Sequence, residues 1–195
     1  YGEAMRLLTA VVAVAGVAGR WPVFVLDAAN RFDPYLVARE GRRLGLAPDQ
    51  VLERIQVARA FTCHQLVQLV EESLPTALAG AAAALVIILG PCSLFYDDQV
   101  PLAERRRLFQ NLVTRLAGLK PRLSLWLLQP PLPPFVANQH FGRLLARLAD
   151  RVARVDPAPG GQGLGRGERG LQLPRSRGLF EPRDYQAATT AGETG

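Results

Sequence analysis

The sequence predicts a three-layer α/β domain built on a mainly parallel β-sheet. Short apolar runs indicate buried strands, and segments of about ten or more residues with helical periodicity separate them. The strand segments are 22–26, 54–58, 84–89 and 123–128. Strands alternating with helices are typical of βαβ units, in which helices cover both faces of a parallel sheet. We therefore expect four core positions on these strands to be buried: Phe24, Val86, Ile88 and Leu127.

Helix ends and apolar spacing predict the elements between the strands. Asp33 is a good capping residue before Pro34, and Gly45 should end that helix. Further helices are expected over 4–17, 48–53, 64–74 and 101–119. The first helix also resembles a signal peptide, although burial against the sheet is the interpretation we favour. The run 77–89 is too short to cross a bilayer, so no membrane partner is expected.

The C-terminal part has a different composition. A Pro-rich loop over 130–134 precedes an Arg-rich segment over 141–155, and Gly residues concentrate in 160–170. This Gly-rich turn predicts a small β-hairpin with strands near 152–155 and 170–173. We expect one domain over 1–185 and a disordered tail over 186–195, because the tail has nothing to pack.

Composition sets bounds on function. With 195 residues, 49% of them apolar, the chain can bury a core without disulfide or metal. The formal net charge of +6 favours an acidic partner such as nucleic acid, although a GC-rich genome that encodes Arg in place of Lys explains it equally well. Cys63 and Cys92 form no CxxC pair, and His64 and His140 lack companions at ligand spacing. We expect no metal site and buried thiols in an intracellular compartment, cytoplasmic or nuclear.

Five ordered segments resemble the archaeal and eukaryotic recombinase branch of the RecA-like family. The most specific is VLERIQVARAFTCHQLVQL (51–69), which resembles the family's junction between its third strand and the next helix. The other segments are FVLDAANRFDP (24–34), LVIILGPCS (85–93), PLAERR (101–106) and WLLQ (126–129). The resemblance spans about 2–175. It implies a RecA-like P-loop NTPase fold and a role in homologous recombination and DNA repair.

The resemblance also implies where ATP chemistry would lie, and other residues stand there. The phosphate-loop Lys and Thr fall on Glu3 and Ala4, the general base falls on Ala29, and the Mg²⁺-orienting acid falls on Gly90. Loss of all four groups predicts a degenerate site without catalytic residues or ATP hydrolysis. Gln129 alone matches the family and is a candidate sensor of nucleotide or DNA. We expect no cofactor, and ATP with Mg²⁺ only if the degenerate site still binds them.

The beginning of the sequence bears on the sheet. In the RecA-like fold, a strand precedes the phosphate loop and sits in the middle of the sheet. The printed chain begins at about that loop, without Met at position 1. We therefore expect upstream residues, and expect the fourth and fifth strands of the family to lack a neighbour here.

The family contacts single-stranded DNA through loops after its fourth and fifth strands, here 94–100 and 130–141. The candidate DNA-binding residues lie beside these loops: Arg105, Arg106, Arg107, Tyr96, Arg143 and Arg147. The rings of Phe95, Tyr96, Phe135 and Phe141 could stack on bases. Phe95 and Phe141 fit better as covers of the sheet edge. The arginines that continue from 143 to 154 also fit a solvated face.

Three functions are consistent with these observations. The leading hypothesis is a catalytically inactive paralogue that binds single-stranded DNA and a RecA-like recombinase or paralogue subunit in an oligomer. The second is a divergent ATPase completed by upstream residues or a neighbouring subunit, against which Gly90 and Ala29 argue. The third is an oligomerisation scaffold without DNA binding. Salt-dependent binding to single-stranded DNA separates the first hypothesis from the third.

Overall fold

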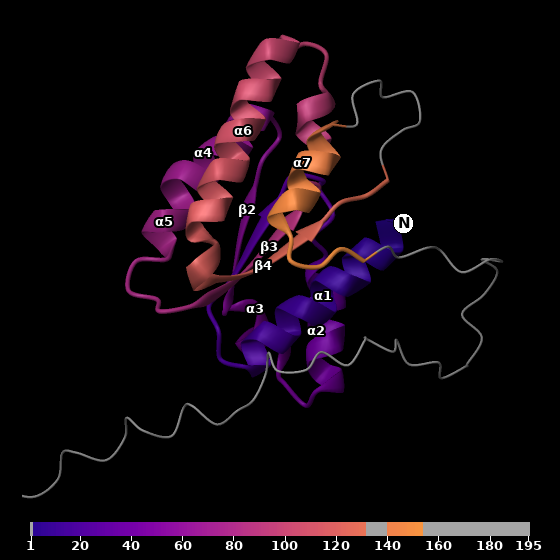
Figure 1. The fold of residues 1–195 in the computed structure, drawn as a ribbon. Coiled ribbons are helices and arrows are strands. Elements are labelled where there is room, and N and C mark those ends of the chain that lie inside the picture. The colour runs from indigo at the N-terminus through magenta and orange to yellow at the C-terminus, as the bar shows by residue number, and fades with distance from the viewer. Residues whose placement is uncertain (1, 132–139, 154–195) are drawn as a thin grey trace, which may run out of the picture. The chain divides into compact units, whose positions relative to one another are not determined.

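A four-stranded parallel sheet forms the centre of the computed structural model, which describes residues 2–131 and 140–153 (Figure 1). The strands are β1 (Val23–Asp27), β2 (Ile55–Arg59), β3 (Ala84–Leu89) and β4 (Leu123–Leu128). They lie in the order β2-β1-β3-β4, and all three pairings are parallel. The predicted α/β class with a parallel sheet is confirmed, because a helix follows each strand and returns the chain to the opposite end of the sheet.

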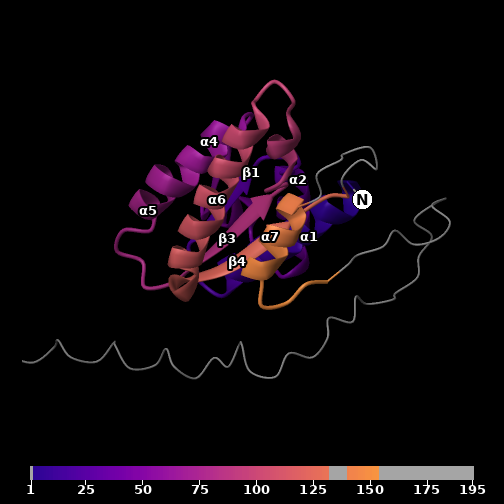
Figure 2. The ribbon, with the colours of Figure 1, turned by 45° about the horizontal axis from the view of Figure 1, so that its top comes forward.

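Helices cover both faces of the sheet (Figures 1 and 2). One layer holds α1 (Gly2–Ala18), α2 (Pro34–Arg43) and α3 (Pro48–Leu52), and its core includes Val25 and Ile87. The other layer holds α4 (Cys63–Gln68), the π-helical turn η1 (Leu69–Ser73), α5 (Leu74–Ala77), α6 (Leu102–Leu119) and α7 (His140–Leu148). Its core includes Leu26 and Ile88. Neighbouring residues of one strand point to opposite faces, so β1 and β3 contribute to both cores.

Helix α1 is part of the core. Ala10, Ala13 and Val14 are buried against the sheet, and Gly16 lies so close to Leu85 and Val23 that a side chain there would overlap them. This packing supports the buried-helix interpretation of the first apolar segment. Among the described residues, no helix is both long and apolar enough to cross a membrane.

The position of each strand in the sheet decides its burial. Phe24, Val86 and Ile88 are buried as predicted, whereas Leu127 is only half-buried. That prediction is wrong because β4 lies at an edge of the described sheet. β3 pairs with β1 on one side and with β4 on the other, from Ala84↔Leu123 to Leu89↔Leu128. The fourth and fifth strands of the family correspond to β3 and β4, which here pair directly with each other, and no other strand lies between them among the described residues.

Several helix ends follow the local sequence. The Asp33 carboxylate accepts hydrogen bonds from the backbone N–H groups of Tyr35 and Leu36, and Gly45 follows α2 with φ of +74°. Two 3₁₀ turns, η2 (Ser93–Tyr96) and η3 (Lys120–Arg122), border α6.

The helix predicted over 64–74 is instead divided into α4, η1 and α5. Pro75 has no N–H, and its ring crowds the carbonyl four residues earlier, which accounts for the widened turn before it. Strand β2 begins at Ile55 and ends at Arg59, one residue later at each end than predicted.

The predicted C-terminal features lie almost wholly outside the described residues. Of the two hairpin strands near 152–155 and 170–173, only Val152 and Ala153 are described, and they belong to neither a helix nor a strand. The domain end at 185 and the tail 186–195 are outside the described ranges.

Candidate functional site at the carboxyl edge of the sheet

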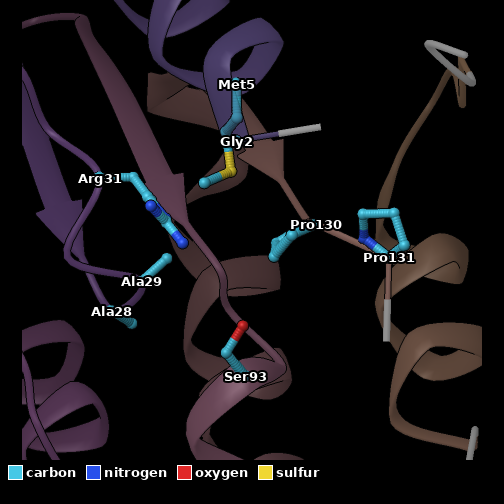
Figure 3. A pocket seen from close by; sticks show the side chains of 8 residues that line it. All are labelled: Gly2, Met5, Ala28, Ala29, Arg31, Ser93, Pro130 and Pro131. Atoms are coloured by element: carbon cyan, nitrogen blue, oxygen red, sulfur yellow. The ribbon is translucent and has the colours of Figure 1, made fainter. Parts of the chain in front are cut away.

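The carboxyl ends of β1, β3 and β4 meet the start of α1 around a cavity of about 470 Å³ (Figure 3). In open parallel sheets, ligands collect at this edge. The Arg31 side chain points into the cavity from one side and Pro130 faces it from the other. The remaining lining residues are small or apolar apart from one hydroxyl: Gly2, Met5, Ala28, Ala29, Ser93 and Pro131.

Asp27 holds the turn after β1 in place. Its buried carboxylate accepts backbone N–H groups from Ala29 at 3.2 Å, from Arg31 at 3.0 Å and from Phe32 at 2.9 Å. The guanidinium of Arg59 lies 3.8 Å away, from Nε to Oδ2. Both carboxylate oxygens are therefore engaged by the protein, and Asp27 acts as an anchor that presents Ala29 and Arg31 to the cavity.

The two positions at which the family resemblance places carboxylates lie against each other. A Cβ atom built on Gly90 would lie 2.8 Å from the Ala29 Cβ and 2.8 Å from the Ser93 Oγ. Gly90 also has φ of +66°, in the left-handed region that a side chain disfavours. The backbone thus brings the degenerate positions together as the resemblance implies, but leaves no room for a carboxylate at position 90.

The residues present do not fit a magnesium ion at this cavity. Protein sites hold Mg²⁺ in nearly octahedral geometry through one or two carboxylates, together with water and substrate phosphates. Asp27 is engaged by the backbone, and Glu3 lies exposed in the first turn of α1 beside the half-buried Ala4. No group of three or more His, Cys, Asp or Glu side chains that could hold a metal occurs within residues 2–131 and 140–153.

Gln129 ties the end of β4 to the turn after β3. Its Oε1 accepts the backbone N–H of Cys92 at 2.8 Å, and its Nε2 donates to the carbonyl of Pro130 at 3.0 Å and to the Ser93 Oγ at 3.4 Å. We call residues 27–32, 90–93 and 129–130 the turn cluster. Gln129 stays a candidate sensor, and its amide is bonded to both turns in this arrangement.

The candidate DNA-binding arginines of α6 have different environments. Arg105 is partly buried, and its Nη1 donates to the Phe95 carbonyl at 3.2 Å, so this side chain helps to hold η2. Arg106 and Arg107 are exposed at the start of the same helix. Of the three, Arg106 and Arg107 are available to a ligand.

An aromatic cluster anchors α7 beside α6. Phe109 lies 4.8 Å between ring centroids from both Phe95 and Phe141, and the three rings are fully buried. Phe95 and Phe141 therefore cover the sheet and cannot stack on bases in this conformation, while Phe135 lies outside the described residues. The Tyr96 ring packs 5.5 Å from Phe141, and burial raises the pKa of its phenol to about 12.

Helix α7 presents Arg143 and Arg147 to solvent. Its C-terminal end is held by Lys120, whose Nζ donates to the Leu148 carbonyl at 3.0 Å and forms an ion pair with Asp150. We call the exposed Arg106, Arg107, Arg143 and Arg147 the arginine face. Helices α6 and α7 follow parallel strands and run side by side, so both begin at the carboxyl edge (Figures 1 and 2).

Three features of the site were not found from the sequence. Arg31 enters the cavity, and a cation directly after the β1 segment was the available signal. The His140 ring packs 4.1 Å from the Phe141 ring. His64 Nε2 lies 2.9 Å from Glu104 Oε1, a contact between α4 and α6 that local spacing does not reveal.

Burial raises the pKa of the Cys92 thiol to about 12, which disfavours its reactive thiolate.

The parallel sheet, its covering helices and a cavity at the carboxyl edge are consistent with the RecA-like class. A model of the Rad51 family matches residues 8–125, which include β1 to β3, α6 and the first half of β4. The chain belongs to the Rad51 family. Its role is thus related to DNA recombination and repair, and DNA and recombinase-type proteins are the partners that the family suggests.

Proposed function

We propose that this chain is a Rad51-family subunit that does not hydrolyse ATP and that supports homologous recombination by binding single-stranded DNA and a recombinase subunit. The observation that carries the proposal is the contact between Ala29 and Gly90. ATP hydrolysis requires oriented groups for the metal ion and the attacking water. Here both positions lack a carboxylate, and the surrounding atoms leave no space for one at Gly90.

The arginine face supports the DNA-binding part of the proposal. None of Arg106, Arg107, Arg143 and Arg147 forms an ion pair with an acidic side chain in the part of the chain that the structure describes. Cations that no carboxylate neutralises are available to phosphate groups, which bind with little regard to base sequence. Asp97 and Asp98 lie exposed before α6 and weaken this field.

Phosphate release from ATP tests the inactive site. We expect background rates for the chain, with and without single-stranded DNA, and the same for the double variant Ala29→Glu/Gly90→Asp, because the second side chain would overlap its neighbours. Sustained turnover that disappears in Gln129→Ala would overturn the proposal and favour a divergent ATPase.

Fluorescence polarisation with labelled oligo(dT) tests the DNA face across salt concentrations. The double variant Arg106→Ala/Arg107→Ala should bind more weakly and reduce the salt slope by about 1.4, since each phosphate contact with a single strand contributes about 0.7. Arg42→Ala/Arg54→Ala removes the same charge from exposed positions on α2 and before β2, and should have little effect. Equal effects of the two variants, or no binding by the unmodified chain, would favour the scaffold hypothesis.

A further inference from the structure

Three buried polar atoms without a hydrogen-bond partner occur among the described side chains, and all three belong to residues at the aromatic cluster of Phe95, Phe109 and Phe141. They are Tyr96 Oη, Arg105 Nε and His140 Nε2. Tyr96 and His140 both pack against Phe141. Arg105 bonds to the backbone carbonyl of Phe95, whose ring belongs to the same cluster. Buried polar groups are nearly always paired with protein, water or an ion, so such a concentration needs an explanation.

Two guanidinium groups face the same place. On α7, Arg143 follows His140 by three residues, which puts both side chains on one face of the helix. On α6, Arg106 precedes Phe109 by three residues, and the Phe109 ring contacts Phe141 at 4.8 Å. Arg106 therefore lies on the side of α6 that is turned toward the start of α7.

Electrostatics agree with this placement. Burial lowers the pKa of His140, and the positive charges of Arg106 and Arg143 lower it further. The third element at this place is η2, which contributes the neutral phenol of Tyr96. Within residues 2–131 and 140–153, no carboxylate pairs with either arginine or with His140. Two like charges beside a partly buried imidazole are unfavourable alone, and an anion would relieve them.

We propose that Arg106 and Arg143 clamp a phosphate oxyanion beside His140, between the starts of α6 and α7. This inference rests on the proposed function for the source of the oxyanion, which is a phosphodiester of single-stranded DNA. Bound phosphate neutralises the two guanidinium groups and favours the imidazolium, so His140 takes up a proton from solvent when phosphate binds. Linkage then makes phosphate binding tighter as the pH falls.

The two histidines of the sequence make the test direct. Imidazole C–H signals in NMR report each pKa, and His64, which faces Glu104 on α6, is the internal control. Titrations are run with chloride alone, with inorganic phosphate and with oligo(dT), at constant ionic strength. We expect oligo(dT) to raise the pKa of His140 and leave that of His64 unchanged, and affinity to rise about fivefold from pH 8 to pH 6. His140→Gln should bind at pH 8 and lose the pH dependence.

A charge-matched pair of variants assigns the effect to the clamp. Arg106→Gln/Arg143→Gln should abolish the response of His140, whereas Arg107→Gln/Arg147→Gln, on the same two helices, should lower affinity but retain the response. DNA binding without a change in the pKa of His140, or the same response in both variants, overturns the clamp and leaves the proposed function standing. A response to inorganic phosphate in a chain that does not bind oligo(dT) supports the clamp and overturns the DNA-binding function. A chain that does not bind oligo(dT) and shows no response of His140 to inorganic phosphate overturns both.

Discussion

The turn cluster lies at the carboxyl edge of the sheet, and the arginine face lies on two helices that begin at that edge, but the two regions differ in how their polar groups are used. In the turn cluster, Asp27 and Gln129 direct their side chains to backbone groups of neighbouring turns. On the arginine face, four cations lack an acidic partner among the described residues. The difference teaches that Asp27 and Gln129 are paired within the turns around the cavity, whereas the four cations on α6 and α7 have no acidic partner among the described residues.

The aromatic anchor of the arginine face should give the largest effect. Phe141→Ala removes a fully buried ring and should lower the free energy of unfolding by about 4 kcal/mol. Urea denaturation measures the loss, and the same variant should bind DNA more weakly because α7 loses its contact with α6. Phe61→Ala, at a side chain that is 67% exposed, is the control and should change little. A loss below about 1 kcal/mol for Phe141→Ala would show that the ring is not an anchor.

The anchor of the turn cluster should come next. Asp27→Asn keeps one acceptor oxygen but turns an amide N–H₂ toward backbone donors. This change should lower the free energy of unfolding by about 3 kcal/mol. Chemical denaturation is the measurement, with the exposed Asp49→Asn of α3 as a control that stays near the unmodified value. Similar midpoints for the two variants would contradict the role assigned to Asp27.

Substitution of Gly90 tests how crowded the turn cluster is around this position. Gly90→Ala adds a Cβ at positive φ, 2.8 Å from two neighbouring atoms, and should destabilise by about 2 kcal/mol. Gly118→Ala in α6 meets open space and should stabilise by about 0.7 kcal/mol, because Ala favours the helix. Thermal melts should therefore shift in opposite directions. If both variants melt at the same temperature, position 90 has room for a side chain.

Lys120 tests how firmly α7 is held. Lys120→Met removes the bonds to the Leu148 carbonyl and to Asp150 and should cost about 1 kcal/mol. Hydrogen exchange should be faster in α7 and unchanged in α4, while Lys120→Arg should retain part of the protection. Uniform exchange rates in the Met variant would mean that the aromatic cluster alone docks the helix.

Tyr96 should give the smallest change at neutral pH. Tyr96→Phe removes a buried hydroxyl without a partner and should alter stability by less than about 0.5 kcal/mol. At high pH the direction of the change in stability follows from the raised pKa of the phenol. The pKa of the phenol is about 12 in the folded protein and lower in the unfolded chain, so stability falls as the pH rises from 10 toward 12. Tyr96→Phe should lack both this decline in stability and the phenol ionisation at high pH that absorbance at 295 nm follows. If that ionisation persists in the variant, it belongs to another tyrosine.

Local sequence predicted the elements well because each has a local cause. The Asp33 cap, the stop at Gly45 and the continuous apolar run of β3 act within a few residues. The half-buried β4 was missed because burial of a strand depends on its neighbours in the sheet. The π-helical turn before Pro75 was missed because a proline can end a helix or widen it, and packing decides between the two.

For the site, the sequence by itself determined which chemical groups are present and which are not. Ala29 and Gly90 lack carboxylates in any fold, and the ordered motifs predicted the family that the match over 8–125 confirms. Tertiary structure decided which groups meet. It placed Gly90 against Ala29, buried Phe95 and Phe141 and brought Arg106 toward His140. The physical reason is that composition and periodicity act along the chain, whereas packing and electrostatic fields act between segments that only the folded sheet brings together.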